Sequence, residues 1–170
     1  EKPSGVTISN NHFGGPGESD GIQVSANGVV IGPGNIFDGL VQGSSSRHVD
    51  AIQLYRQSNT KIVGNYFTNN SVQIMAPDGG DNDIIAHNVF VGNNFDRQAI
   101  QLGSQAKTQF LHNTVRNIDI QLNKRTESPK FSTHVIVRNN VLINSGFNTV
   151  DSRRTESCID CVFEQNLFDT

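Results

Sequence analysis

The sequence predicts an all-β solenoid of about seven stacked coils, and three observations support this. A short strand followed by an asparagine, with a large apolar residue two positions later, recurs along the chain. The asparagines are separated by 24, 30, 23, 25, 27 and 26 residues, and they are Asn11, Asn35, Asn65, Asn88, Asn113, Asn140 and Asn166. A second phrase, apolar-Gln-apolar, falls between them. A period of this size is typical of stacked repeats, and no helical apolar stripe competes with it.

The asparagine phrase predicts a strand exit and a return to the core. Asparagine tolerates left-handed backbone and binds neighbouring backbone groups, so it suits a tight turn, and stacked asparagines can bond to one another. The apolar residue two positions later is expected to face inward as one layer of a core stack. These residues are Phe13, Phe37, Phe67, Phe90, Val115, Leu142 and Phe168.

The glutamine phrase alternates strictly, which predicts a half-buried strand. The aliphatic residues are expected to point inward and the glutamines outward, because side chains alternate between the two faces of a strand. The expected result is a flat amide face, with Tyr55 and Arg56 at its edge, that binds an extended sugar chain or whose glutamines simply pair in a ladder. The glutamines assigned to this face are Gln23, Gln53, Gln73 and Gln101.

Composition narrows the class of protein. The 170 residues suffice for one domain, residues 1–170, with a sizeable core. A net charge of −3 and a pI near 5.9 argue against a nucleic-acid partner, and no apolar run is long enough to span a bilayer. Abundant Asn, Gly and Ser suggest a secreted bacterial protein. No polar cap precedes Val6, so we expect a segment of a longer protein or oligomers formed through uncapped ends.

This pattern resembles the right-handed parallel β-helix from about Val6 to Phe168. The chain is therefore similar in fold to the pectate-lyase-like superfamily of polysaccharide lyases and hydrolases. The resemblance implies a protein that acts on a polysaccharide, most simply by β-elimination from a polymer of uronic acids. The alternatives are a non-catalytic polysaccharide-binding or adhesin segment, a glycoside hydrolase, for which SDGIQVS weakly resembles NTDGI, and a uronan epimerase.

Function in a solenoid is expected where one coil departs from its neighbours. Long excursions span residues 38–49 and 123–133, and a shorter one spans residues 76–83. All three adjoin the glutamine strands, which predicts a groove over that face.

The sharpest polar cluster lies at the end of the first excursion. His48 and Asp50 alternate on one side of a strand, and Asp20 is expected one coil away, about 5 Å from Asp50 at the strand spacing. For β-elimination we expect the catalytic groups among His48, Asp50, Tyr55 and Arg97. Asp20 and Asp50 at that distance would instead suit a retaining glycosidase. A purely structural reading has His48 donating to Asp50 as a clasp.

Hard oxygen ligands predict Ca²⁺ as a cofactor. Glu18, Asp20 and Asp50 form one expected site, and Asp78, with Asp81 and Asp83, forms a second.

The two cysteines, Cys158 and Cys161, are expected to form a local disulfide or to remain as two thiols, since no further Cys or His pair completes a zinc site.

Overall fold

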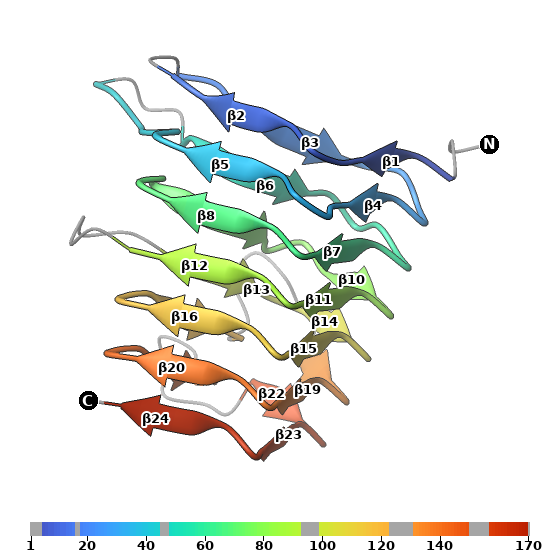
Figure 1. Cartoon of the computed structure of the whole chain (residues 1–170). Coiled ribbons are helices and arrows are strands. Elements are labelled where there is room, and N and C mark those ends of the chain that lie inside the picture. The colour runs from blue at the N-terminus through green and yellow to red at the C-terminus, as the bar shows by residue number, and fades with distance from the viewer. Residues whose placement is uncertain are drawn as a thin grey trace.

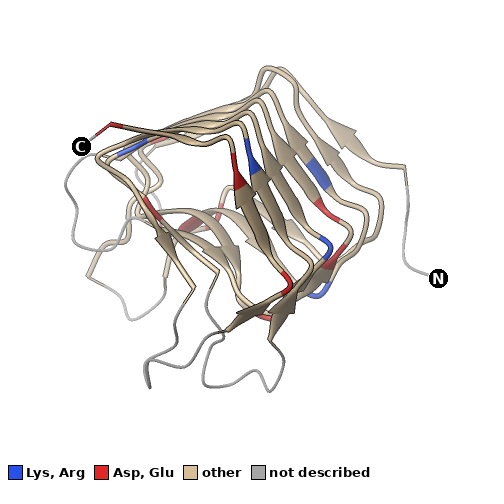
Figure 2. Cartoon of the chain, turned by 90° about the horizontal axis from the view of Figure 1, so that it is seen from below, with Lys and Arg blue, Asp and Glu red and all other residues tan. Residues whose placement is uncertain are grey.

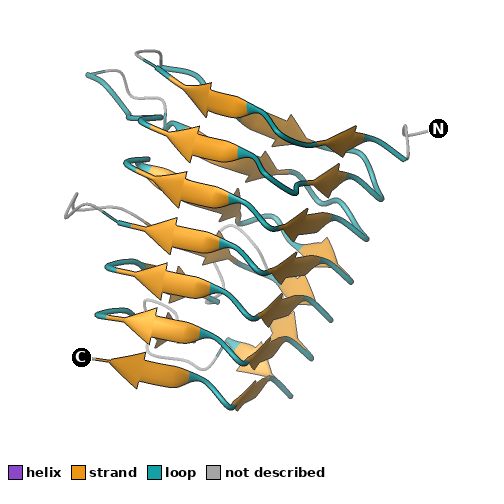
Figure 3. Ribbon diagram, in the orientation of Figure 1, coloured by secondary structure: helices purple, strands orange, loops and turns teal. Residues whose placement is uncertain are grey.

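The computed structural model describes residues 5–15, 18–44, 48–92, 99–122, 131–149 and 157–169, and it confirms a right-handed parallel β-helix. All strand pairs are parallel, and the coils stack one below another from the N-terminal to the C-terminal end (Figure 1). None of the described residues is helical (Figure 3), and accordingly no helix among them could cross a membrane.

Each coil contributes one strand to each of up to four sheets. The first seven-stranded sheet contains β1 (Thr7–Ile8), β4 (Val30–Ile31), β7 (Lys61–Val63), β11 (Ile84–Ala86), β15 (Gln109–Leu111), β19 (Ile136–Arg138) and β23 (Val162–Glu164). The second contains β2 (His12–Gly14), β5 (Ile36–Asp38), β8 (Tyr66–Thr68), β12 (Val89–Val91), β16 (Thr114–Arg116), β20 (Val141–Ile143) and β24 (Leu167–Asp169).

The glutamine phrases form a six-stranded sheet. It contains β3 (Ile22–Val24), β6 (Asp50–Leu54), β9 (Val72–Ala76), β13 (Ala99–Leu102), β17 (Asp119–Gln121) and β21 (Phe147–Asn148). A fourth sheet, which the sequence did not predict, contains β10 (Gly80–Asp81), β14 (Gln105–Ala106), β18 (Ser132–Thr133) and β22 (Cys158–Ile159). Part of the expected 76–83 loop is therefore strand. Since only the middle coils contribute to every sheet, the number of complete turns is slightly below the seven predicted.

The recurrent asparagines form the predicted ladder inside the corner between the two seven-stranded sheets. Asn65 shows the pattern: its Nδ2 donates to Ile31 O at 2.9 Å and to Asn88 Oδ1 at 3.0 Å. The left-handed residue, however, is the one before each ladder asparagine rather than the asparagine itself. These residues are Asn10, Gly34, Gly64, His87, His112, Asn139 and Gln165. The ladder asparagine can then point inward and satisfy the buried backbone groups of the turn.

The predicted aromatic stack is present in the first four coils. Phe37 and Phe67 lie 4.6 Å apart between ring centroids with planes 5° apart, and both are fully buried. The column then continues as Val115, and Phe110 from the neighbouring sheet stacks on Phe90 at 6.2 Å. A large residue in one column thus compensates for a small residue in the other, which keeps the core filled.

The predicted glutamine face is wrong in register and in exposure. Gln53 aligns with Gln23 on one side but with Met75, not Gln73, on the other. Gln53 and Gln73 are buried, and Gln101 is half-buried, so that Gln23 alone among the four predicted binding glutamines is exposed. Gln73 Oε1 accepts from Asn70 Nδ2 at 2.8 Å. These amides bond within the protein and do not form an open platform for sugar.

Charged residues are sparse on the described surface. Lys and Arg are interleaved with Asp and Glu rather than gathered in one basic band (Figure 2). The clearest ion pair joins Arg138 to Glu164 in the next coil.

Candidate metal centre

The register of β3 and β6 brings three potential ligands together. Ile22 pairs with Ile52, which places Asp20 directly beside Asp50 in the next coil. His48 lies two residues before Asp50 on the same side of the chain. The ligand atoms of Asp20, His48 and Asp50 all lie within 4.8 Å of one another. The predicted meeting of these three side chains is therefore present in the structure.

Asp50 is the anchor of this cluster, which we call the Asp–His–Asp cluster. Its side chain is fully buried at the start of β6. Its Oδ2 lies 2.6 Å from His48 Nδ1, and the His48 side chain is 58% exposed. With the proton on Nδ1, His48 donates to Asp50, as the clasp interpretation predicts. The imidazole is thus held at the surface by a buried carboxylate, an arrangement that fixes the ring orientation of a metal-binding or proton-transferring histidine.

Asp20 is held by two hydrogen bonds. Its Oδ1 accepts from the backbone N–H of Asp50 at 2.8 Å, and its Oδ2 accepts from Gln23 Nε2 at 2.8 Å. A carboxylate offers about four acceptor positions, so both oxygens keep capacity for a cation. The hydrogen bond from the Asp50 N–H also holds the Asp20 carboxylate beside Asp50, so the cluster is arranged before any ion binds.

Glu18 does not join this cluster. Its carboxylate instead lies against Gly43, where an added Cβ would come within 2.0 Å of Glu18 Oε1. The predicted Glu18–Asp20–Asp50 ligand set is therefore replaced by Asp20, His48 and Asp50 among the described residues.

The second predicted acidic site also does not assemble. Asp78 is exposed, Asp81 is exposed on β10, and Asp83 turns into the core with 2% of its surface exposed. Asp83 Oδ1 accepts from Thr60 N–H at 2.7 Å, and its Oδ2 accepts from Gln57 Nε2 at 2.8 Å. Burial raises the pKa of Asp83 to about 7 despite these two hydrogen bonds. Asp83 therefore stabilises the corner of the coil through these bonds and does not contribute to a calcium-binding loop.

Tyr55 lies within the electrostatic influence of the Asp–His–Asp cluster. It directly follows β6 and is 38% exposed. Partial burial raises its pKa above the ordinary value of 10, and the negative charges of Asp20, Asp50 and Asp78 raise it further. The phenol therefore remains protonated at neutral pH and lies within the electrostatic reach of all three carboxylates. Arg97, the remaining predicted catalytic residue, lies outside the described residues.

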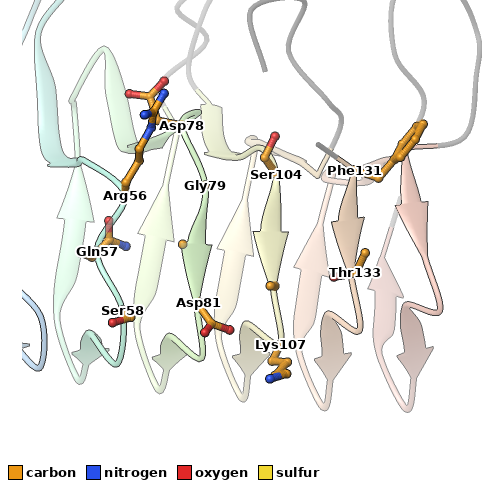
Figure 4. Close-up of a pocket in the computed structure, with 12 residues that line it drawn as sticks. Arg56, Gln57, Ser58, Asp78, Gly79, Asp81, Ser104, Lys107, Phe131 and Thr133 are labelled. Carbon is orange, nitrogen blue, oxygen red and sulfur yellow. The ribbon is translucent and has the colours of Figure 1, made fainter. Parts of the chain in front are cut away.

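A groove on the fourth sheet has a volume of about 760 Å³ and runs across β10, β14 and β18. In Figure 4 the side chains of Arg56 and Asp78 point toward one another at one end, and Phe131 marks the far side. Ser104, Lys107 and Thr133 add polar groups to its walls. Sequence reasoning placed the groove over the glutamine sheet. The structure forms it on the neighbouring fourth sheet, whose two-residue strands are too short to give a periodic signal.

The fold and the cluster define a parallel β-helix protein with a mixed carboxylate and imidazole centre. The family described as "Periplasmic copper-binding protein (NosD)" matches residues 1–101, which include the whole cluster. The chain belongs to this family. No curated protein and no solved structure matches it.

Proposed function

We propose that the chain binds a divalent transition-metal ion at Asp20, His48 and Asp50. The observation that carries this proposal is the convergence of three ligand atoms from two coils within 4.8 Å, with Asp50 fully buried. A single ion between the two carboxylates would offset their mutual repulsion. Binding would replace the proton between His48 Nδ1 and Asp50 Oδ2, so it should release a proton and weaken as the pH falls.

The donor set favours some ions over others. One imidazole nitrogen and two carboxylates suit Cu(II) or Zn²⁺. Cu(I) prefers thiolate and thioether, but Cys158 and Cys161 form a disulfide and Met75, the one methionine of the chain, is buried. Ca²⁺, which the sequence predicts, takes six to eight oxygens, so the cluster supports it less well. The copper of the family description therefore fits these residues in its oxidised form.

Tyrosine fluorescence tests this proposal, because the chain has two tyrosines and no tryptophan. In a Tyr66→Phe background, bound Cu(II) should quench Tyr55, and an ion at 100 times its Kd should raise the free energy of unfolding by about 2.7 kcal/mol. Asp20→Asn keeps an oxygen for the Asp50 N–H but removes a charge, so it should weaken binding without loss of fold. Asp81→Asn is the matched control. Equal affinity in the Asp20→Asn variant and the control would refute the proposal.

A second candidate function is action on an acidic polysaccharide, favoured by the groove that begins at Arg56, the residue after Tyr55. Arg56 and Lys107 offer positive charge for sugar carboxylates, and Phe131 offers an aromatic face. In β-elimination, His48 would take the C5 proton, and the electrons of the C5–H bond would form the C4–C5 double bond. The C4–O4 bond would break at the same time, and Tyr55 would protonate the departing O4. The raised pKa of Tyr55 suits an acid rather than a base.

This second candidate has its own measurement. Incubation with alginate, pectate and heparin-type polymers should generate the ultraviolet absorbance of an unsaturated uronate, and the Tyr55→Phe variant should lose it. Binding without absorbance, weakened by Arg56→Gln, would instead favour the polysaccharide-binding or adhesin alternative. If the protein neither binds these polymers nor generates the absorbance, both the lyase and the polysaccharide-binding alternatives are refuted. A secreted bacterial location also belongs to this proposal, supported by the periplasmic family description and by the disulfide.

A further inference from the structure

Two histidines occupy the same turn position in successive coils, away from the Asp–His–Asp cluster. His87 and His112 each directly precede a ladder asparagine and have left-handed backbone, with φ of 56° and 52°. Both side chains are exposed. Their rings stack with centroids 5.0 Å apart and planes 2° apart. The two imidazoles therefore face solvent side by side at the corner between the two seven-stranded sheets.

The backbone beneath this pair is held rigidly. Asn88 Nδ2 donates to Asn113 Oδ1 at 3.1 Å, and the Asn88 backbone N–H donates to the same oxygen at 3.0 Å. On the other side of the histidines, Ala86 pairs with Leu111 in the β11–β15 register. The separation of the two histidine backbones is thus set by the strand spacing, whereas the exposed rings remain free to turn about their side-chain bonds.

The neighbouring turns leave room for a cation. Gly64 occupies the equivalent position one coil before His87, so the residue at that position adds no side chain over that ring. Asn139 occupies it one coil after His112 and has an amide oxygen. The nearby cation Arg138 is paired with Glu164. The corner therefore presents two nitrogen donors, an oxygen donor and access for water.

We propose that His87 and His112 together form a surface site for a divalent transition-metal ion such as Cu(II) or Zn²⁺. Metal–imidazole bonds are about 2.0–2.1 Å long, so one ion bound by both rings needs two nitrogens within about 4 Å of each other. The rings now lie parallel at 5.0 Å, so both must turn about their side-chain bonds until a nitrogen of each points at the shared ion. Asn139 or water completes the coordination. Two imidazoles without carboxylate make this site selective for borderline transition metals over Ca²⁺ and Mg²⁺.

This site is independent of the proposed Asp–His–Asp centre. His87 and His112 lie in turns after β11 and β15, whereas Asp50 begins β6 of a different sheet. The alternative explanation is that histidine is merely tolerated at left-handed positions, where it is enriched several-fold. Replacement by asparagine separates the two, because asparagine preserves the left-handed turn and removes the imidazole.

The test is a Cu(II) titration of the whole chain in a His48→Gln background, followed by electron paramagnetic resonance. We expect one Cu(II) ion to bind to the His87–His112 pair, with a spectrum that shows two equivalent nitrogen ligands. Loss of an outer-shell partner alone costs about 10–100-fold in metal affinity, so His87→Asn or His112→Asn should each weaken binding at least about tenfold. His134→Asn is the matched control, since His134 is also exposed and left-handed with φ of 54° but stacks on no described histidine.

Each outcome is decisive. Two-nitrogen coordination that is lost equally in both single variants, with His134→Asn unchanged, supports the pair. Spectra of a single nitrogen ligand would overturn the proposal if each single variant also left binding at the remaining histidine unchanged. The two imidazoles would then bind ions independently. If His134→Asn weakened Cu(II) binding as much as His87→Asn or His112→Asn does, the binding would be adventitious and the proposal would be refuted. Because the background lacks His48, failure here leaves the Asp–His–Asp centre untouched, and failure of that centre leaves this result untouched.

Discussion

Gln57 Nε2 donates a hydrogen bond of 2.8 Å to Asp83 Oδ2 across one coil, and both side chains are buried. Burial holds the pKa of Asp83 at about 7, against an ordinary value of 3.8. Between these values the folded chain binds a proton that the unfolded chain has lost, so stability should fall as the pH rises from 4 to 7. The shift of about three units corresponds to up to roughly 4 kcal/mol. Urea unfolding across this range measures it.

Asp83→Asn should remove this pH dependence and leave the protein at least as stable as the wild type at pH 8. The asparagine oxygen can still accept from Thr60 N–H. Gln57 Oε1 is buried and accepts no hydrogen bond from the described residues, so a flip of the Gln57 amide would let it accept from the new side-chain N–H. Asp119→Asn, at an exposed position on another coil, is the control and should keep the wild-type slope. A persistent slope in the Asp83→Asn variant would contradict the assignment.

A break in the asparagine ladder should be far more costly inside the coil than outside it. Asn88 Nδ2 donates to Ile62 O at 2.8 Å, and its Oδ1 accepts from Asn65 N–H at 2.9 Å. Asn88→Ala would leave these buried groups unpaired at about 1–3 kcal/mol each, so we expect a total loss of several kcal/mol. Asn82→Gly, in the exposed ladder where Asn82 donates to Asn59, preserves left-handed backbone and should cost under about 1 kcal/mol. Equal costs would show that the inner ladder is not special.

The fold could be predicted from the sequence because its columns repeat one residue type in one position. The asparagines form the ladder at the turn and the phenylalanines form the core stack, so the spacing of these residues was enough to predict stacked coils. The glutamine register could not be obtained in the same way. Val72-Gln73-Ile74-Met75-Ala76 places apolar residues inward whether Gln73 or Met75 pairs with Gln53, because a shift by two residues keeps every side chain on its face.

The candidate sites could likewise be predicted only in the parts that depend on a local sequence pattern. His48 and Asp50 were visible as an alternating pair on one strand, and Asp20 followed once β3 and β6 were aligned. The burial of Gln53 and the inward turn of Asp83 depend on how neighbouring coils cover them, which a local pattern does not contain. The His87–His112 pair did leave a signal that was missed: the dipeptide His-Asn occurs in two successive asparagine phrases.

The pKa of Tyr55 should respond to the charge of Asp20. Burial and the carboxylates of Asp20 and Asp50 raise it above 10. In a Tyr66→Phe background, Asp20→Asn should lower it toward 10 without reaching that value, because the effect of burial remains. The absorbance of tyrosinate during an alkaline titration measures this change, with circular dichroism to verify the fold. Asp119→Asn, on a distant coil, should have no effect. An unchanged pKa in the Asp20→Asn variant would separate Tyr55 from the cluster.

The exchange of size between Phe110 and Val115 should appear as strong energetic coupling. Both are fully buried, and Phe110 stacks on Phe90, the residue that pairs with Val115 in the neighbouring strand. Val115→Phe alone overpacks the coil and should cost about 1–3 kcal/mol. Phe110→Ile alone leaves a cavity with a cost of similar size.

The double variant should extend the Phe37–Phe67–Phe90 stack by one layer while the other column regains its aliphatic residue. Its loss of stability should therefore be at least about 1 kcal/mol smaller than the sum of the two single losses, as measured by urea denaturation. Val115→Phe combined with Ile31→Val, several coils away, is the control and should be additive. Additivity in the Phe110–Val115 pair as well would mean that the two columns fill their space separately, and that the stack ends at Phe90 for a reason other than volume.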